Sequence, residues 1–281
     1  MEAAPSRTAM LAAVARGLLR LEATQPWVLD DAFALVLVGP VWQELREGPV
    51  SLFPAEVVRE VLAGICTRSR YAEDRLAAGA FAQYVILGAG LDSFAWRRPD
   101  LLRSLRVFEV DHPASQAWKL ERVRDLGLPV SDSQVFVPAD FEAEPVQDAL
   151  GTAGFDWGQP TLFSWTGVAP YLTAQAIAST LRAVAGTVAG SKVVFSYRAE
   201  AAVLDDVGRE FIRIYAPLAA SLGEPLQPGW PAMEIEQLIS RSGLKVADHP
   251  VRADLQERYF AGRADGLRPF TAESLVTARV I

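Results

Sequence analysis

The spacing of hydrophobic residues changes from helical to strand-like near residue 80. Residues 6–24 (SRTAMLAAVARGLLRLEAT) place apolar side chains at three- and four-residue intervals, which predicts an amphipathic helix with Ser6 or Thr8 as its N-cap. A second helical pattern covers 54–79, from a proline suited to a first turn to a glycine suited to a C-terminal stop. We therefore expect the chain to begin with helices.

Short apolar runs follow, and helical stretches over 113–126, 142–151 and 173–189 separate most of them. Runs of this length that end at Gly, Asp or Ser are typical of buried strands. Strands that alternate with helices form a parallel sheet with right-handed crossovers. The predicted strands are QYVIL (83–87), LRVFEVD (105–111), SQVFVPAD (133–140), TLFSW (161–165) and SKVVFSY (191–197).

The last third of the chain departs from this alternation. Residues 199–240 join a helical stretch to the turn-rich GEPLQPGWP, which indicates a lid or binding loop. Two further strands follow and suit antiparallel pairing at the sheet edge. We expect a single α/β domain with a doubly wound, Rossmann-like, mostly parallel sheet. It would comprise a helical cap (1–80), a cofactor-binding core (81–198), a lid insertion (199–240) and closing strands (241–281).

Composition narrows the range of partners. A formal net charge of -7 and a pI near 5.0 disfavour a nucleic-acid-binding surface. One cysteine, Cys66, and two histidines suit neither a disulfide framework nor a standard zinc site. The sequence contains no signal-peptide pattern and no apolar stretch of about 18 residues. We expect a cytoplasmic protein that binds a small molecule, without metal, nucleic acid or membrane.

The turn in YVILGAGLDS (84–93) points to a ligand. Gly88 and Gly90, on either side of Ala89, permit positive φ and close backbone approach at the carboxyl end of a strand, where open α/β sheets bind ligands. The dinucleotide fingerprint needs another glycine three residues later, which is missing, and the carboxylate of Asp92 would repel a pyrophosphate. A cationic ligand without phosphates, S-adenosyl-L-methionine, is therefore favoured over NAD.

Acidic residues end the next two predicted strands. Glu109 and Asp111 share one side of their strand, and Asp111, at its very end, is better placed to accept hydrogen bonds from ribose hydroxyls. The third strand ends at Asp140 and Phe141, which suit the amino group and ring of adenine. The alternative is that these acids cap the helices that follow.

Further motifs are spread over most of the chain: RTAMLAAVARG near the start, RSRYAED (68–74), VILGAGLDSFAWRRP, FEVDHPASQAWK, VPADFE, SWTGVAPYLT (164–173), ERYFAGRADGLRPF and LVTARV. Together they resemble the S-adenosylmethionine-dependent methyltransferases related to leucine carboxyl methyltransferase, including bacterial relatives in natural-product pathways. The resemblance implies a class I methyltransferase fold, this cofactor and a role in secondary metabolism.

The resemblance also implies residue roles. Gly88 and Gly90 would line the methionine part of the cofactor, Arg68 would lie near its carboxylate and the acceptor, and Tyr171 would lie nearby. Asp111 would hold the ribose. The residues expected at the cofactor are Arg68, Gly88, Ala89, Gly90, Asp92, Asp111, His112, Asp140, Phe141, Thr166 and Tyr171.

One position departs from the family pattern. Many relatives carry an acid where this chain has Thr166. The contact of that acid with the ammonium group of the cofactor is therefore absent here or supplied elsewhere, for example by Asp92. This difference leaves the preference of the relatives for carboxyl acceptors open for this chain.

The methyl acceptor is the least determined part. A carboxylate is already ionised at neutral pH and needs no general base, which fits the scarcity of histidine. The alternative is C-, N- or O-methylation of an indole or phenol, with Tyr171, His112, Tyr197 or Tyr215 as candidate groups and the first three as the expected catalytic residues. His112 equally suits a packed position after the second strand. Arg198 suits either a substrate carboxylate or a solvated face.

Aromatic residues gather around the expected acceptor side, which suits a flat or hydrophobic substrate. Arg213, in the predicted lid, suits either a substrate carboxylate or a solvated face, as Arg198 does. Two further hypotheses stay open at this point: a NAD-dependent oxidoreductase, and a non-catalytic protein that retains the fold for binding.

Overall fold

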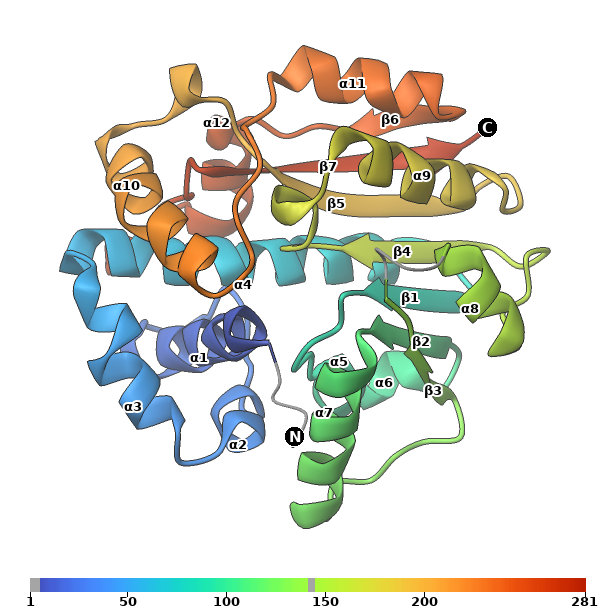
Figure 1. The fold of residues 1–281 in the computed structure, drawn as a ribbon, viewed down its shortest axis with the longest axis horizontal. Coiled ribbons are helices and arrows are strands. Elements are labelled where there is room, and N and C mark those ends of the chain that lie inside the picture. The colour runs from blue at the N-terminus through green and yellow to red at the C-terminus, as the bar shows by residue number, and fades with distance from the viewer. Residues whose placement is uncertain (1–5, 141–144) are drawn as a thin grey trace.

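A seven-stranded sheet with the order β3-β2-β1-β4-β5-β7-β6 crosses the computed structural model, which describes residues 6–140 and 145–281 (Figure 1). Strands β1 to β5 are parallel where they pair, and β7 is antiparallel to both β5 and β6. The strands are β1 (Gln83–Leu87), β2 (Arg106–Asp111), β3 (Gln134–Pro138), β4 (Thr161–Trp165), β5 (Lys192–Arg198), β6 (Leu244–Asp248) and β7 (Glu273–Val280).

This sheet confirms the predicted fold class. All five predicted parallel strands form, with ends that differ by at most two residues from the expected ranges. The two closing strands also form. The antiparallel strand β7 lies one position inside the sheet, however, and β6 takes the edge.

Helices cover both faces of the sheet. Their bounds are α1 (Arg7–Glu22), α2 (Ala34–Val38), α3 (Trp42–Glu47), α4 (Ala55–Ala77), α5 (Phe94–Arg97), α6 (Pro99–Leu102), α7 (Pro113–Asp125), α8 (Val146–Thr152), α9 (Ala174–Ala185), α10 (Asp206–Ser221), α11 (Ala232–Arg241) and α12 (Arg252–Leu255). The predicted first helix is α1, where the Ser6 hydroxyl accepts a hydrogen bond from the Ala9 N–H at 3.3 Å.

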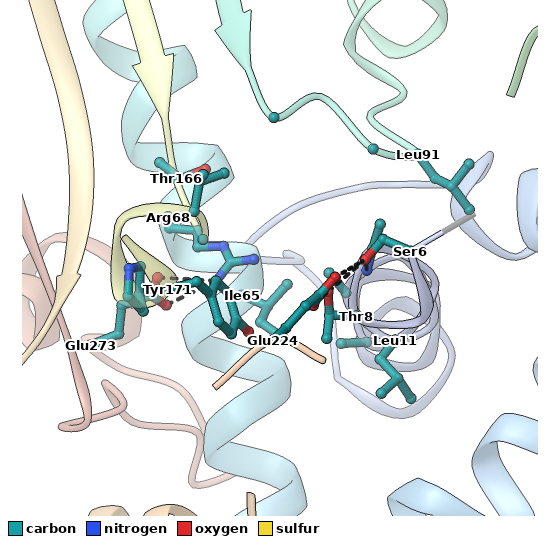
Figure 2. A pocket seen from close by; sticks show the side chains of 18 of the residues that line it. Ser6, Thr8, Leu11, Ile65, Arg68, Leu91, Thr166, Tyr171, Glu224 and Glu273 are labelled. Carbon is teal, nitrogen blue, oxygen red and sulfur yellow. Dashed lines mark hydrogen bonds and ion pairs between the residues drawn. The ribbon is translucent and has the colours of Figure 1, made fainter. Parts of the chain in front are cut away.

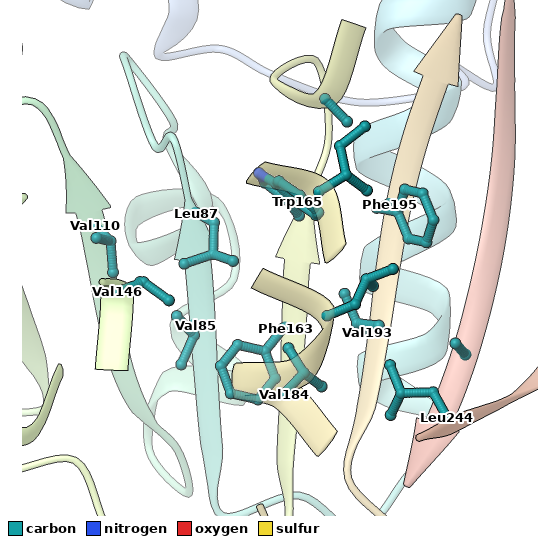
Figure 3. Packing of buried hydrophobic residues seen from close by; sticks show 14 of the residues in the cluster. Val85, Leu87, Val110, Val146, Phe163, Trp165, Val184, Val193, Phe195 and Leu244 are labelled. Carbon is teal, nitrogen blue, oxygen red and sulfur yellow. The ribbon is translucent and has the colours of Figure 1, made fainter. Parts of the chain in front are cut away.

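Alternation along β1 divides the core between the two faces. Val85 and Leu87 point into a cluster formed with α8, α9 and α11, and this packing is visible around Phe163 in Figure 3. Tyr84 and Ile86 point to the opposite face, where they pack with side chains of α4. Strands buried on both faces need continuous apolar sequence, which explains why these runs could be recognised.

The segment over 199–240 divides between two locations. Helix α10 lies beside α4, away from the sheet (Figure 1). Helix α11 returns to the sheet, and its Ile235 and Ile239 are fully buried in the same cluster as Val85. The part of this segment that covers the carboxyl ends of the strands is therefore α10 and the loop after it. No helix among the described residues is both long and apolar enough to cross a membrane.

Candidate functional site

A cavity of about 610 Å³ lies at the carboxyl ends of the parallel strands. Its floor is formed by the turns after β1 to β4 and the end of β5, and its walls include α1, α4, α10 and the loop after α10. Side chains from these distant segments converge in Figure 2, with Arg68 and Thr166 near Tyr171, and Glu224 beside Thr8. The volume is in the range of pockets that hold small molecules.

The cavity brings together the expected cofactor residues within the described parts of the chain. Phe141 lies outside the described residues. The lining includes Arg68, Gly88, Ala89, Gly90, Asp92, Asp111, His112, Asp140, Thr166 and Tyr171. In residues 6–140 and 145–281, no group of three or more His, Cys, Asp or Glu side chains is arranged to hold a metal ion.

The glycine turn has the conformation that its sequence predicts. Gly88 and Gly90 have φ values of 69° and 50°, in the left-handed region that favours glycine. The N–H groups of Gly88 and Ala89 both donate to the Val110 carbonyl, at 2.8 and 3.0 Å, which fastens the turn to β2. A Cβ on Gly88 would lie 2.3 Å from Cγ2 of Val168. A residue with a side chain at position 88 would therefore have a strained backbone and would clash with Val168.

Asp111 lies directly against the glycine turn. One of its carboxylate oxygens accepts from the Gly90 N–H, and the other accepts from the His112 N–H at 2.6 Å. Burial raises the pKa of the Asp111 carboxyl, although both hydrogen bonds oppose this shift. The N-cap of α7 is His112, whose Nδ1 accepts from the Ala114 N–H at 3.2 Å. The helix-capping alternative thus describes His112 and not Asp111.

The second acid of β2 has a structural role. Glu109 is 1% exposed, forms an ion pair with Lys119, and accepts from Nε2 of Gln134 at 2.7 Å. It is not among the residues that line the cavity. Asp92 does line it, but its Oδ1 accepts from the Phe94 N–H at 2.6 Å and so fixes the loop before α5.

Arg68 belongs to a sheltered ion pair. Its Nη1 lies 3.0 and 3.1 Å from the two carboxylate oxygens of Glu273, and the two side chains are 16% and 13% exposed. A Cβ on Gly167 would lie 2.4 Å from Nη2 of Arg68. The guanidinium is therefore packed into the cavity wall, in contrast to a surface ion pair.

Two tyrosines face each other across the cavity wall. The hydroxyls of Tyr171 and Tyr215 are 2.8 Å apart. Burial raises the pKa of both phenols, that of Tyr171 well above its ordinary value. Both side chains are therefore protonated at neutral pH, with one hydroxyl donating to the other, and neither is a ready general base.

Tyr197 lies apart from the other two catalytic candidates. Its ring is buried in the core cluster on the α9 face of the sheet, and its hydroxyl is 2.7 Å from Nε2 of His249. Burial raises the pKa of Tyr197 to about 12. It is absent from the described cavity lining, whereas Tyr171 and His112 are part of it.

Sequence reasoning missed a contact that joins α1 to the loop after α10. The carboxylate of Glu224 accepts hydrogen bonds from the hydroxyls of Ser6, at 2.9 Å, and Thr8. More than 200 residues separate these partners, so no local spacing indicates the contact.

Arg16 is a second missed residue. It pairs with Asp31 at 2.8 Å and donates to the Leu91 carbonyl at 2.6 Å, which supports the end of the glycine turn. A charged residue within the apolar run AAVARGLL indicates a buried arginine that needs a partner, and this was the signal in the sequence.

A family comparison decides between the classes of protein that this cavity suits. The model of the leucine carboxyl methyltransferase family matches residues 9–185. The chain belongs to this family. Membership in the leucine carboxyl methyltransferase family confirms the resemblance found in the sequence motifs, and it gives no support to a NAD-dependent oxidoreductase.

Individual relatives agree with the family match. YktD of Bacillus subtilis, named as a candidate S-adenosyl-L-methionine-dependent methyltransferase, is 38% identical over 189 residues, which cover 67% of this chain and 62% of YktD. A Mycobacterium tuberculosis (strain H37Rv) protein with the same description is 33% identical over 181 residues, 60% of this chain and 56% of the relative. The matched region thus spans less than two thirds of either relative.

Solved structures share the fold at low sequence identity. A protein from Thermobifida fusca, titled a candidate methyltransferase, has a TM-score of 0.67 at 15% identity and covers 99% of this chain and 96% of its own. A DUF574 family protein from Streptomyces avermitilis has a TM-score of 0.66 at 15% identity, and the match covers 96% of this chain and 97% of that protein. At these identities the likeness concerns the fold alone.

Proposed function

We propose that this protein transfers a methyl group from S-adenosyl-L-methionine to a small-molecule acceptor. The observation that carries the proposal is the cavity itself: in a chain of this family, a glycine turn, Asp111 and Arg68 line one cavity. The names of the bacterial relatives support the same cofactor.

The residues present suit this cofactor. The cradle at Gly88 and Gly90 has no room for a Cβ next to Val168, so the backbone itself offers the contact surface. Asp111, whose carboxylate lies beside that turn, would accept hydrogen bonds from the ribose hydroxyls, and Asp140, which lines the cavity after β3, would lie at the adenine end. Arg68 would pair with the cofactor's carboxylate. When bound, the cofactor supplies an electrophilic methyl group on a sulfonium.

The protein's contribution to catalysis would be positioning and exclusion of water. Methyl transfer requires the acceptor atom in line with the bond that breaks, so a fixed geometry provides much of the acceleration. Apolar side chains of α1, α4 and α10 surround the cavity, and Glu224 fastens the loop after α10 to α1. With cofactor and acceptor bound, these walls would limit the access of water to the reacting groups.

The chemistry of the wall favours O-methylation of a carboxylate. The phenols of Tyr171 and Tyr215 are held protonated by burial. His112, the histidine in the described lining, uses Nδ1 to cap α7. A carboxylate acceptor is already ionised and requires no proton removal, so it could be methylated in this cavity without a general base. Aromatic side chains in the lining favour the alternative of a methylated indole or phenol.

A product screen tests the proposal. Purified protein is incubated with methyl-labelled S-adenosyl-L-methionine and separate pools of carboxylic acids, phenols and indoles, and products are identified by mass spectrometry. We expect labelled methyl esters, which mild alkali hydrolyses. Label in alkali-stable ethers, amines or carbon-linked methyl groups would replace the carboxylate assignment by the aromatic one. Cofactor binding without transfer to any pool would contradict methyl transfer as the function.

A further inference from the structure

The cavity contains an arginine that the cofactor assignment leaves unused. Arg198 ends β5 and lines the cavity. Its Nη1 donates to the Gln227 carbonyl at 2.7 Å, while its Nε is buried without a hydrogen-bond partner. The cross-strand neighbour of Arg198 is Glu273, but that carboxylate is bonded to Arg68.

An unpaired guanidinium in a cavity indicates an anionic ligand. Among the described residues, no carboxylate lies within ion-pair distance of Arg198, whereas Arg16, Arg68 and Arg97 each have at least one. Burial lowers the pKa of Arg198, which reflects the cost of keeping its charge away from water. A carboxylate brought by a ligand would offset that cost and match the planar donor pattern of the guanidinium.

The wall on this side of the cavity is aromatic. Phe53, Phe211 and Tyr215 stack in sequence, with ring centroids 5.7 and 4.9 Å apart and interplanar angles of 23° and 17°. Phe270 packs edge-on against Phe211 at 5.0 Å. All four rings line the cavity. Such a wall offers a surface against which a flat apolar group packs well.

We propose that this region is the acceptor subsite and that Arg198 binds a carboxylate on a flat, aromatic acceptor. The inference rests on the proposed function, because that function assigns the turns after β1, β2 and β3 to the cofactor and leaves the β5 side for the acceptor. Arg198 holds this carboxylate whichever acceptor atom is methylated, and is thus a residue that determines substrate specificity.

A second arginine provides a matched control. Arg213 lies on α10, its side chain is 69% exposed, and it pairs with Glu210 at 2.7 Å. It does not line the cavity. Its replacement removes the same charge from the protein without changing a residue of the proposed subsite.

Calorimetric titration with 2-naphthoate and its uncharged analogue 2-naphthamide tests the proposal. Both probes are added to the wild-type protein, Arg198→Met, Arg198→Lys and Arg213→Met, with and without saturating S-adenosylhomocysteine. We expect naphthoate to bind the wild type more tightly than naphthamide does. Arg198→Met should weaken naphthoate at least tenfold and leave naphthamide unchanged. Arg198→Lys should lose less, and Arg213→Met should match the wild type.

The affinity for S-adenosylhomocysteine separates the two proposals. It should be equal in all four proteins, and equal melting temperatures establish that each is folded. Naphthoate binding that is absent from the wild type, unchanged in Arg198→Met or no tighter than that of naphthamide would overturn the subsite. So would a loss of S-adenosylhomocysteine affinity confined to Arg198→Met. Absence of S-adenosylhomocysteine binding in the wild type would instead overturn the proposed function, and titrations without it still test Arg198.

Discussion

Replacing Asp111 with alanine is the most informative perturbation of the cofactor site. The carboxylate ends β2, touches the glycine turn through the Gly90 N–H, and also accepts from the His112 N–H. If it receives the ribose hydroxyls, its removal should weaken cofactor binding while the rest of the cavity is retained.

The structure sets the expected magnitude. A hydrogen bond to a charged group contributes about 1.5–3 kcal/mol. The Asp111 carboxylate already has two backbone donors, and burial raises its pKa, so the contribution to binding should fall at the low end of this range. We expect about a tenfold increase in Kd for S-adenosyl-L-methionine, or about 1.4 kcal/mol.

Isothermal titration calorimetry at neutral pH measures this change. Asp125→Ala provides the control, because Asp125 lies at the end of α7 with a 57% exposed side chain, outside the cavity lining. Its Kd should equal that of the wild type. Wild-type affinity in a folded Asp111→Ala protein would refute the ribose assignment.

A pH series tests the same carboxylate independently. The ionised Asp111 carboxylate accepts stronger hydrogen bonds than the protonated acid, and burial raises its pKa above the ordinary value of about 4. Affinity should therefore be complete at neutral pH and fall as the pH is lowered through the raised pKa. Asp111→Asn should lack this dependence. Circular dichroism at each pH establishes that the proteins remain folded.

Three further predictions concern stability and reactivity. Gly88→Ala should cost about 1–3 kcal/mol more than Gly127→Ala in urea unfolding, because both glycines have positive φ but only the former would meet a neighbour within 4 Å; equal costs would contradict the crowding. Lys119→Met should destabilise the protein by about 3–5 kcal/mol, since it strands the buried Glu109 carboxylate, and adding Glu109→Met should recover most of that loss; no recovery would argue against an ion pair. Cys66 is buried, and burial raises the pKa of its thiol to about 12, so a disulfide thiol reagent at pH 8 should modify it only after unfolding, and rapid modification of the native protein would oppose this.

Much of the fold could be predicted because its signals are local. The parallel strands are buried on both faces, and that burial requires apolar runs. The turn at Gly88 and Gly90 could be predicted for the same reason, since positive φ and close approach are properties of the residues themselves. The end of β2 likewise placed Asp111 at the sheet edge where ligands bind.

The acceptor side could not be predicted in the same way. The aromatic character of its segment indicated Tyr215, but nothing local indicated Glu224. The docking of α10 beside α4, which brings both residues to the cavity, depends on tertiary packing. The pairing of Glu273 with Arg68, which leaves Arg198 without a carboxylate, joins residues about 200 positions apart.

The alternation of side chains along β5 argues against Tyr197 as a catalytic residue. Phe195 and Tyr197 occupy one face of the strand and both enter the core cluster. Ser196 and Arg198 occupy the other face, and Arg198 reaches the cavity. Residue type suggested Tyr197 as a catalytic group, whereas strand geometry places it in the core.

The central claim is that the space above the glycine turn holds S-adenosyl-L-methionine. A crystal structure of the protein with S-adenosylhomocysteine tests it most directly. We predict electron density for the nucleoside in the cavity, with its ribose hydroxyls on the Asp111 carboxylate and its backbone contacts at Gly88 and Gly90. An empty cavity at saturating concentrations, or a nucleoside bound elsewhere on the protein, would contradict the account.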